Sequence, residues 1–444
     1  MALDGLTCSL LAKELNDQLT GARIDKIFQP DKYTIFMHIR SSQGNMKLLI
    51  SFNPSAPRLH LTKTTRENPT MPPSFCMLLR KYCSGAKISS ITCPDYERII
   101  EISFLTTDEL HDIKEMKLVI ELMGRYSNCI LVNPNGRIID SAIHVDFSVS
   151  RVREVMPARL YEYPPNQEKN NATTALDILN NGELPILESE MNRPVAKGLL
   201  NSIKGFSPLI VNQICLKADI ENNKPLKTID EEEKTRLIST LKSELLKVIN
   251  QDITPIYCLT EDNEAKDFCY TNLEGFNNVY SCNSISEAID EFYCLKESNI
   301  DFENKRQALL SIVNNALVHA SKKYEIHNSD FEEGQKAEVY KKKGDILLCF
   351  AYMIKNKDTS ITCQDIYDDL GRDITIALDP ALNATDNAQE YFKKFHKAKR
   401  KLELSMEYIE DDKSAIEYLR TLKTAIMSAS TDEDLSALRA ELDH

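Results

Sequence analysis

The chain contains no run of about 18 consecutive apolar residues, the length that a membrane-spanning helix requires. Its N-terminus, MALDGLTCSLLAKELND, carries acidic residues where a secretory signal peptide would be basic. These two absences predict a cytoplasmic protein that has no membrane partner.

The sequence also lacks the motifs of common catalytic and metal sites. It has no G-x-x-x-x-G-K-[ST] or G-x-S-x-G element, no H-E-x-x-H pair and no C-x-x-C pair. Its 12 cysteines and 8 histidines are dispersed, and His38 and His60 lie in strand-like runs that favour structural roles. We therefore expect reduced thiols, no cofactor, no metal and no catalytic residue. This absence of motifs predicts a binding factor rather than an enzyme.

Basic charge is scarce overall, but it is unevenly distributed. The net charge is −13, yet residues 1–165 hold 20 Lys+Arg against 18 Asp+Glu, and the remainder holds 34 against 49. A local basic patch on an acidic protein can bind phosphates while the rest repels non-specific RNA. A solvated surface is the alternative interpretation. Within 51–87 the one acid is Glu67, and the basic residues are Arg58, Lys63, Arg66, Arg80, Lys81 and Lys87. The candidate phosphate contacts are Arg58, Lys63, Lys81 and Lys87, together with Gly205 further along the chain.

The length of 444 residues exceeds what one hydrophobic core supports, so about three domains are expected. We predict an α+β domain at 1–170 and a helical domain at 174–249. A segment at 250–295 is expected to return and pack on the first domain. Residues 296–444 are predicted to form coiled-coil arms with a small tip near 360–380.

The stretch Pro72–Ser141 predicts a helix followed by an antiparallel meander. Phe75, Leu78, Leu79 and Tyr82 form one apolar helical face after two prolines, and Gly85 is placed to end the helix. The β-type runs that follow are Ile99–Leu105, Leu118–Leu122, Cys129–Val132 and Arg137–Ile139.

The polar residues of this stretch admit two interpretations. Strand alternation places Arg98 on the same face as Ile100 and Ile102, where a guanidinium needs a partner, and places Glu97 with Glu101. Glu121 lies between two apolar residues. A buried ion pair that ties strands together is one interpretation, and a polar cluster that recognises a ligand is the other.

Local sequence patterns predict the other helices and strands of the first half of the chain. Thr7 is the expected cap of a helix that ends near Gly21, and strands are expected at Arg23–Phe28, Thr34–Arg40 and Met46–Phe52. Further on, two helical runs flank Lys204-Gly205-Phe206-Ser207-Pro208. This is a helix-hairpin-helix pattern, in which Gly205 lets backbone amides face a phosphate. A purely structural helix pair explains the pattern as well.

The C-terminal third has the heptad pattern of a coiled coil. Tyr391, Phe395, Ala398, Leu402, Ser405 and Ile409 step by four and three residues, and a polar break follows at Asp411-Asp412-Lys413. Between the two predicted arms, Ser360–Cys363 and Ile374–Leu378 flank a turn and predict a hairpin at the tip. A rod that reaches a distant surface and a dimerisation rod both fit.

Several long motifs in the same order resemble the NFACT-N domain of the RqcH/NEMF family of ribosome quality-control factors. They are LLISFNPSAPRLHLT, FCMLLRK, the Glu97-Arg98 pair, ELMGRYSN, GRIIDSAIHV and SRVREVMPARLYEYPP. The resemblance implies a domain similar to the N-terminal fold of formamidopyrimidine-DNA glycosylases. It also implies a helix-hairpin-helix module and a long antiparallel coiled coil.

The resemblance further implies a function. Family members bind the large ribosomal subunit with stalled peptidyl-tRNA, recruit alanine tRNA and support template-free addition of C-terminal alanines, while the ribosome makes the peptide bonds. An aspartate–arginine pair engages tRNA in the family, and Glu97 and Arg98 occupy the matching positions, the acid being one methylene longer. Arg125, Asn128 and Arg80 are the next candidates for tRNA contact or its support.

Two further expectations concern the family. Members usually continue into a basic NFACT-R domain, whereas this sequence ends at ALRAELDH. Either the sequence is a fragment or the domain is missing, and weaker ribosome affinity is expected in both cases. Older family labels name fibronectin as a partner, so a surface adhesin is the alternative function. The absence of an export signal argues against a primary extracellular role.

Overall fold

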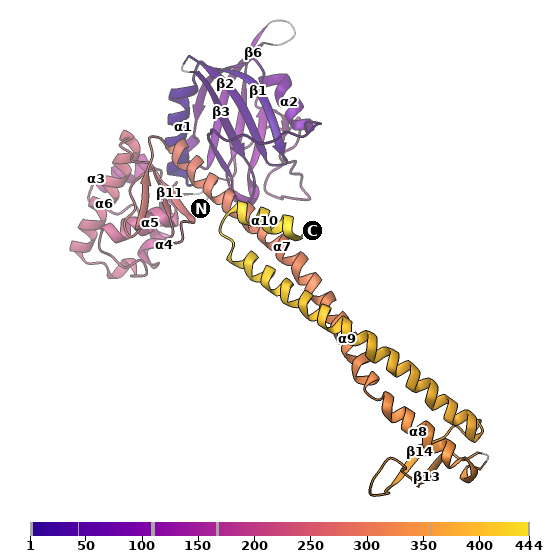
Figure 1. Cartoon of the computed structure of the whole chain (residues 1–444). Helices are drawn as coiled ribbons and strands as arrows, with labels where there is room; N and C mark the ends of the chain where they lie inside the picture. The colour runs from indigo at the N-terminus through magenta and orange to yellow at the C-terminus, as the bar shows by residue number, and fades with distance from the viewer. Residues whose placement is uncertain (1–2, 43, 108–111, 166–167, 356, 443–444) are drawn as a thin grey trace. The chain divides into compact units, whose positions relative to one another are not determined.

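The structure is a computed structural model that describes residues 3–42, 44–107, 112–165, 168–355 and 357–442. The chain divides into two compact units, Met1–Ser298 and Asn299–His444 (Figure 1). Within the described residues no helix is long and apolar enough to cross a membrane. All 12 cysteines are free, and 8 of them are buried.

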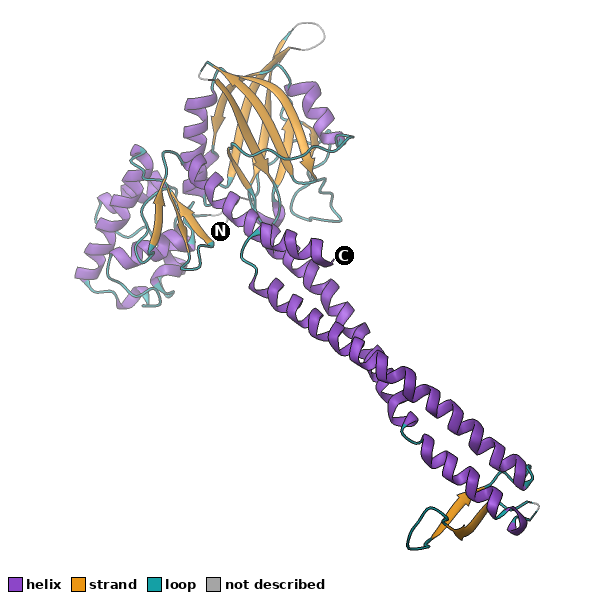
Figure 2. Ribbon diagram, viewed as in Figure 1, coloured by secondary structure: helices purple, strands orange, loops and turns teal. Residues whose placement is uncertain are grey.

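The first unit is built around a sheet of nine antiparallel strands in the order β4-β3-β2-β1-β5-β6-β7-β8-β9 (Figure 2). Strands β1 and β5 pair at Arg23 and Lys87, and backbone hydrogen bonds between 21–24 and 85–88 extend this pairing, so two meanders are joined into one sheet. The alternating patterns of the sequence correctly predicted most of these strands. Their bounds are β1 Arg23–Asp31, β2 Thr34–Ser41, β3 Gly44–Ser51, β4 Arg58–Leu61, β5 Lys87–Thr92, β6 Ile99–Thr107, β7 Ile113–Glu121, β8 Asn128–Val132 and β9 Ile138–Ser141.

Two helices, α1 (Gly5–Leu19) and α2 (Ser74–Cys83), flank these strands in Figure 1. Helix α2 begins after Pro73 and buries Phe75 and Leu79, as its apolar face predicted. The cap predicted for α1 was wrong. Asp4, not Thr7, is the N-cap, and its carboxylate accepts a hydrogen bond of 2.8 Å from the Thr7 amide. A helix one turn longer buries more apolar surface, because Leu6 is also fully buried.

A helical module follows the sheet in the chain. Its helices are α3 (Ala172–Asn180), α4 (Val195–Ser202), α5 (Pro208–Lys217) and α6 (Glu231–Asn250). The predicted helix-hairpin-helix is present as α4 and α5, with Gly205 at φ +81° and Ser207 capping α5. Short 3-10 turns occur in both halves of the unit, at Pro94–Tyr96, Gly124–Tyr126, Glu188–Glu190 and Leu226–Thr228.

The segment after α6 forms a three-stranded sheet that shares the core of the first unit. Its strands are β10 (Ile256–Leu259), β11 (Ala265–Cys269) and β12 (Asn278–Ser281). Tyr270 is fully buried in the hydrophobic cluster that also holds Leu11 of α1 and Leu241 of α6. The sheet, the helical module and this segment therefore pack around one continuous core.

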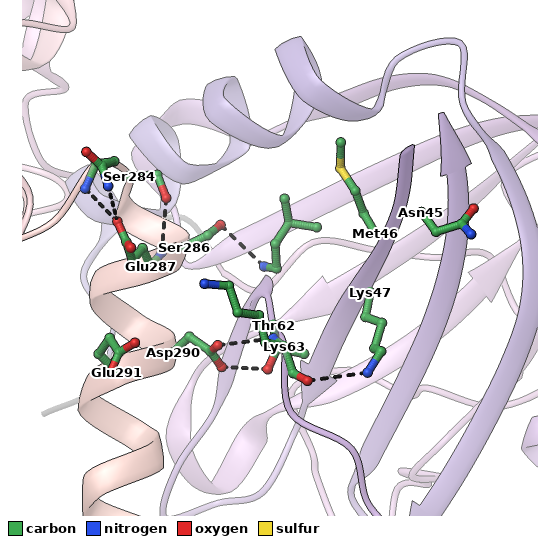
Figure 3. Close-up of a pocket in the computed structure, with 12 residues that line it drawn as sticks. Asn45, Met46, Lys47, Thr62, Lys63, Ser284, Ser286, Glu287, Asp290 and Glu291 are labelled. Atoms are coloured by element: carbon green, nitrogen blue, oxygen red, sulfur yellow. Dashed lines mark hydrogen bonds between the residues drawn. The ribbon is translucent and has the colours of Figure 1, made fainter. Parts of the chain in front are cut away.

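Helix α7 (Ile285–Gly334) starts against the edge strand β4. Thr62 Oγ1 donates to Asp290 at 2.5 Å, and the Lys63 amide donates to the same carboxylate at 3.2 Å (Figure 3). Glu14 of α1 accepts from the Ile285 and Ser286 amides at 2.7 and 3.1 Å, which caps the helix. These contacts fix the first turns of α7 to the first unit.

The second unit consists of long antiparallel helices and a small hairpin (Figure 2). Besides α7, the elements are α8 Ala337–Cys349, a 3-10 turn Ala351–Met353, β13 Ser360–Gln364, β14 Asp373–Ala377, α9 Ala384–Ser428 and α10 Asp432–Leu442. Asp330 of α7 pairs with Lys401 of α9 at 2.7 Å, and Lys305 of α7 pairs with Asp432 of α10 at 2.9 Å. Because the earlier residue of α7 meets the later residue of the C-terminal helices, the two arms are antiparallel. The predicted tip hairpin is present and antiparallel.

The polar residues at 411–413 interrupt the apolar stripe of the sequence but lie inside the continuous helix α9. The heptad continues through Asp412, which is buried in the seam with Tyr391, Ala398 and Ser405. Its carboxylate lies 2.6 Å from His327 Nδ1 and 3.3 Å from Lys323 Nζ. A buried carboxylate needs such partners, so this polar layer fixes the register between α7 and α9.

A crossing near the start of α1 has no room for a side chain at Gly5. A Cβ there would lie 1.8 Å from the Tyr96 carbonyl oxygen and 2.6 Å from the Gly205 Cα. We expect Gly5→Ala to lower the free energy of unfolding by about 1–3 kcal/mol, measured by urea denaturation. Asp17→Ala, on the exposed face of the same helix, should change it by less than about 0.5 kcal/mol. Equal stability of the two variants would contradict the tight crossing.

His60 makes the first unit sensitive to acid. Its ring is 1% exposed, and burial, aided by Arg58, lowers its pKa from 6.5 to about 4. Between these values the unfolded chain binds the proton and the folded chain does not, so stability falls as the pH drops through this window. The full loss is about 3 kcal/mol. Urea denaturation of wild type and His60→Gln between pH 7 and 4.5 measures it. The pH dependence should flatten in that variant and persist in His144→Gln, which alters an exposed histidine.

Candidate nucleic-acid interface

A cavity of about 360 Å³ opens where three distant segments meet. The segments are the start of α1, the turn before β6 and the hairpin between α4 and α5. The predicted residues Glu97, Arg98 and Gly205 all line it. Lys169 and Lys204 lie there with them, as do Asp4, Phe206, Ser207 and the pair Pro164-Pro165.

The crossing is held by hydrogen bonds between the N-terminus and the hairpin. Ser207 Oγ donates to Asp4 at 2.7 Å, and the Leu6 amide donates to the Gly205 carbonyl at 3.3 Å. Burial raises the pKa of the Asp4 carboxyl above its ordinary value. The Asp4 carboxylate therefore connects the N-terminus of α1 to the hairpin between α4 and α5 through hydrogen bonds.

Two acids at this cavity, Asp95 and Glu97, are directed at Lys204. This side chain is 6% exposed, forms an ion pair with Asp95, and lies 3.2 Å from Glu97. Burial opposes its charge, but the hydrogen bonds to Asp95 and Glu97 raise the pKa of Lys204. Lys169 donates to the Leu200 carbonyl at 3.1 Å, and burial lowers its pKa. Both lysines are thus held in place by protein groups.

Arg98 differs from its cationic neighbours because its side chain is exposed. Among the residues that the structure describes, its guanidinium makes no hydrogen bond or ion pair, and only its backbone carbonyl is bonded, to Leu122. A guanidinium presents up to five donors to carboxylate or phosphate oxygens. The rim of the cavity therefore offers a cation with unused donors.

The strand phase predicted for Arg98 was wrong. Strand β6 begins at Ile99, and Asp95 and Tyr96 have positive φ angles of 46° and 55° that break the extended run before it. The buried ion pairs of this sheet involve other acids. Glu101 bonds Lys117 at 2.7 Å, and Glu121 bonds Arg153 at 2.5 Å. The acids of these buried ion pairs are thus Glu101 and Glu121, and neither Glu97 nor Arg98 takes part in them.

A second cavity of about 440 Å³ adjoins the first, because Met123, Pro164 and Pro165 line both. Arg125 is on its rim, stacked on Tyr126 with 4.7 Å between guanidinium carbon and ring centroid. Asn128 is buried, and its amide bonds the Ile143 backbone at 2.7 and 3.0 Å. Its groups are used internally, so Asn128 supports the wall of this cavity.

The remaining predicted residues do not converge on either cavity. Arg58 is 3% exposed, paired with Glu297, and stacked 4.2 Å over Tyr293. Arg80 donates to the Ile27 carbonyl at 2.8 Å, which ties α2 to β1. Lys63 lines a separate depression at the start of α7, shown in Figure 3, and Lys81 and Lys87 are exposed. The patch predicted from 51–87 is therefore divided among buried and scattered positions.

Sequence reasoning missed Asp4, Lys169 and Lys204 as cavity residues. Lys204 is the first residue of the hairpin pattern, so the pattern itself contained one signal. Asp4 and Lys169 gave none, because only the fold brings them to the same place. No cluster of His, Cys, Asp or Glu in the described part of the chain is suited to hold a metal ion.

Comparison with known proteins identifies relatives over the full length of the chain. A family model described as NFACT N-terminal and middle domains matches residues 4–444. RqcH of Bacillus subtilis, an Rqc2 homologue, is 32% identical over 449 residues, which cover 100% of this chain and 75% of that protein. RqcH of Streptococcus pneumoniae is 30% identical and covers 100% and 74%.

Solved structures resemble about two thirds of the chain. The fibrinogen binding protein from Staphylococcus aureus matches with a TM-score of 0.54 and 32% identity, covering 66% of this chain and 99% of that one. The N-terminal part of the fibronectin/fibrinogen-binding protein from Streptococcus suis matches with 0.53 and 26%, covering 66% and 98%. A DNA complex of Lactococcus lactis Fpg matches with only 0.26 and 11%, covering 56% and 78%, and no functional conclusion follows from it.

The family model spans almost the whole chain, and full-length relatives at 30% identity or more agree with it. The motifs that suggested the resemblance lie in the sheet, in α2 and around the two adjoining cavities. The chain therefore belongs to the RqcH family of NFACT-domain proteins.

Proposed function

We propose that this protein is a ribosome quality-control factor that binds the large ribosomal subunit carrying stalled peptidyl-tRNA. It recruits alanine tRNA and directs template-free addition of C-terminal alanines to the nascent chain. The relationship to RqcH proteins over the full length of this chain supports this role. The ribosome supplies the peptide-bond chemistry, and the factor supplies binding and positioning.

The observation that carries the proposal is the unpaired, exposed guanidinium of Arg98 at the rim of the 360 Å³ cavity. Among the described residues, its cationic neighbours Lys169 and Lys204 are engaged by protein groups, whereas Arg98 is not. A guanidinium whose donors are free can bind a phosphate or a base edge through paired hydrogen bonds. We assign tRNA contact to Arg98 and support of the cavity to Glu97, through its contact with Lys204.

A second candidate function is adhesion to a host protein. It is favoured by two similar proteins of known structure whose names include fibrinogen or fibronectin as the ligand. Detection of this protein in a cell-wall fraction free of lysis markers, together with saturable fibronectin binding, would support it. Retention of tRNA without fibronectin binding would leave the quality-control role.

We expect Arg98→Ala to weaken tRNA binding by about ten- to a hundred-fold, since hydrogen bonds from a charged donor contribute about 1.5–3 kcal/mol each. Filter binding of total tRNA at two salt concentrations, followed by sequencing of the retained RNA, measures affinity and selectivity. The salt dependence of log Kd should also become shallower, because one phosphate-directed cation is lost.

Arg40→Ala is the matched control, because Arg40 is a surface arginine of the same unit whose side chain is 70% exposed and lines neither cavity. It should bind tRNA like wild type. Equal binding by Arg98→Ala and Arg40→Ala would show that Arg98 is not a contact. If wild type does not retain alanine tRNA selectively, the proposed selectivity for alanine tRNA is wrong.

A further inference from the structure

The small sheet of the first unit has one strand edge that the described part of the chain leaves open. Its strand order is β11-β10-β12, so β12 pairs with β10 alone. The register of this pair, from Ile256 with Ser281 to Leu259 with Asn278, runs without a shift. We propose that this edge binds an extended, cationic segment of a partner protein as an added strand. The proposal does not depend on tRNA or ribosome binding.

The backbone groups of Val279 and Ser281 face away from β10. The Cys282 amide bonds the Pro255 carbonyl at 2.8 Å, and hydrogen-bonded pairs alternate along an antiparallel ladder. Tyr280 therefore bonds β10, whereas the amides and carbonyls of the residues on either side of it point outward. These outward groups have no hydrogen-bond partner within the described residues. They offer donors and acceptors at the spacing of a strand.

The edge has none of the features that usually prevent pairing with another chain. Natural edge strands are protected by lysine, proline, a bulge or a covering element. Residues 278–281 contain no charged residue and no proline, and 279–281 are all exposed. The opposite edge differs, because the pairing of β11 has a register shift and this strand ends in the buried residues Phe268 and Cys269. A strand can therefore be added at β12.

The face of the sheet beside this edge is suited to cations. Tyr257 and Tyr280 stack with ring centroids 5.1 Å apart and 12° between the ring planes, and Tyr280 is 44% exposed. Burial raises the pKa of the Tyr257 hydroxyl, and the carboxylates of Glu291 and Glu287, in the first turns of α7 (Figure 3), raise it further. Glu291 is exposed and forms no hydrogen bond or ion pair within the described residues. Aromatic rings beside carboxylates bind guanidinium groups through cation–π contacts and charge-assisted hydrogen bonds.

Charge and strand periodicity select the occupant. Residues 251–298 hold 10 Asp+Glu against 2 Lys+Arg, so this region attracts a basic segment and repels an acidic one. Alternate side chains of an added strand lie on opposite faces of the sheet. One set would meet Tyr280 and the carboxylates, and the other would cover Val279, which is 36% exposed. We therefore expect a segment in which arginine or lysine alternates with apolar residues.

A fluorescein-labelled peptide of alternating arginine and valine, seven residues long as about one strand requires, is the probe. Fluorescence anisotropy with the full chain should show saturable binding. The same peptide with glutamate in place of arginine should bind at least about ten-fold more weakly, because its charge is repelled.

Val279→Pro tests the strand edge. It removes an outward amide and leaves the hydrogen bonds between β10 and β12 in place, since proline is tolerated where the amide of an edge strand faces solvent. We expect binding of the arginine–valine peptide to weaken at least about ten-fold, because a hydrogen bond is lost and the proline ring obstructs the added strand. Val279→Thr keeps the amide and the branched side chain and should bind like wild type.

N-methylated peptides test the same edge without altering the protein. In an added strand, either the valine amides or the arginine amides face β12, depending on strand orientation. Methylation of one set should abolish binding, and methylation of the other set should preserve it. These two peptides decide the question alone if Val279→Pro lowers the thermal stability of the chain.

The carboxylates are tested by charge removal. Glu287→Gln combined with Glu291→Gln should weaken peptide binding about three- to ten-fold and make it less dependent on salt. Glu231→Gln combined with Glu232→Gln is the matched control, because these side chains of α6 are 91% and 87% exposed and the charge change is the same. The control should bind like wild type.

Loss of binding with one methylation pattern, together with weaker binding by Val279→Pro than by Val279→Thr, supports the inference. An equal effect of both methylation patterns would show that charge alone holds the peptide and would overturn the added strand. A wild-type dimer that Val279→Pro converts to a monomer would assign the edge to a second copy of this chain and overturn the cationic partner. Absence of peptide binding to wild type would overturn it as well. Retention of tRNA, measured in parallel, tests the proposed function separately.

Discussion

The first unit depends on one close backbone crossing. Gly5 of α1, Tyr96 of the turn before β6 and Gly205 of the hairpin approach so closely that a Cβ at Gly5 would overlap the Tyr96 carbonyl. The Asp4 carboxylate then bonds both its own helix and Ser207. Because these segments lie far apart in sequence, the crossing requires that the sheet and the helical module fold as one core.

The same crossing creates the candidate interface. It brings Arg98, Lys169 and Lys204 to one cavity and pairs Asp95 and Glu97 with Lys204, so the Arg98 guanidinium retains free donors among the described residues. A fully neutralised cluster would have little affinity for phosphate, and an unpaired cluster would be unstable. Dividing the cations into an engaged lysine and an exposed arginine meets both constraints.

In the second unit, the long helices α7 and α9 must be kept in one register. A uniform apolar seam permits slippage, whereas the layer of Asp412, His327 and Lys323 is satisfied only in one alignment. Gly334 adds a steric constraint, because a Cβ there would lie 2.8 Å from Leu402. Polar pairing and close approach together fix the two arms.

Elements with local signals could be predicted from the amino-acid sequence. Alternation identified strands β1 to β3, the two prolines and apolar face identified α2, the Gly205 pattern identified the hairpin, and heptad spacing identified the seam of α9. Other features depended on contacts between distant segments. Two left-handed residues moved Arg98 out of the strand, α7 buried Arg58 against Glu297, and the fold alone brought Asp4 and Lys169 to the cavity. Local patterns record backbone periodicity, whereas the environment of a charge depends on tertiary contacts that no local pattern encodes.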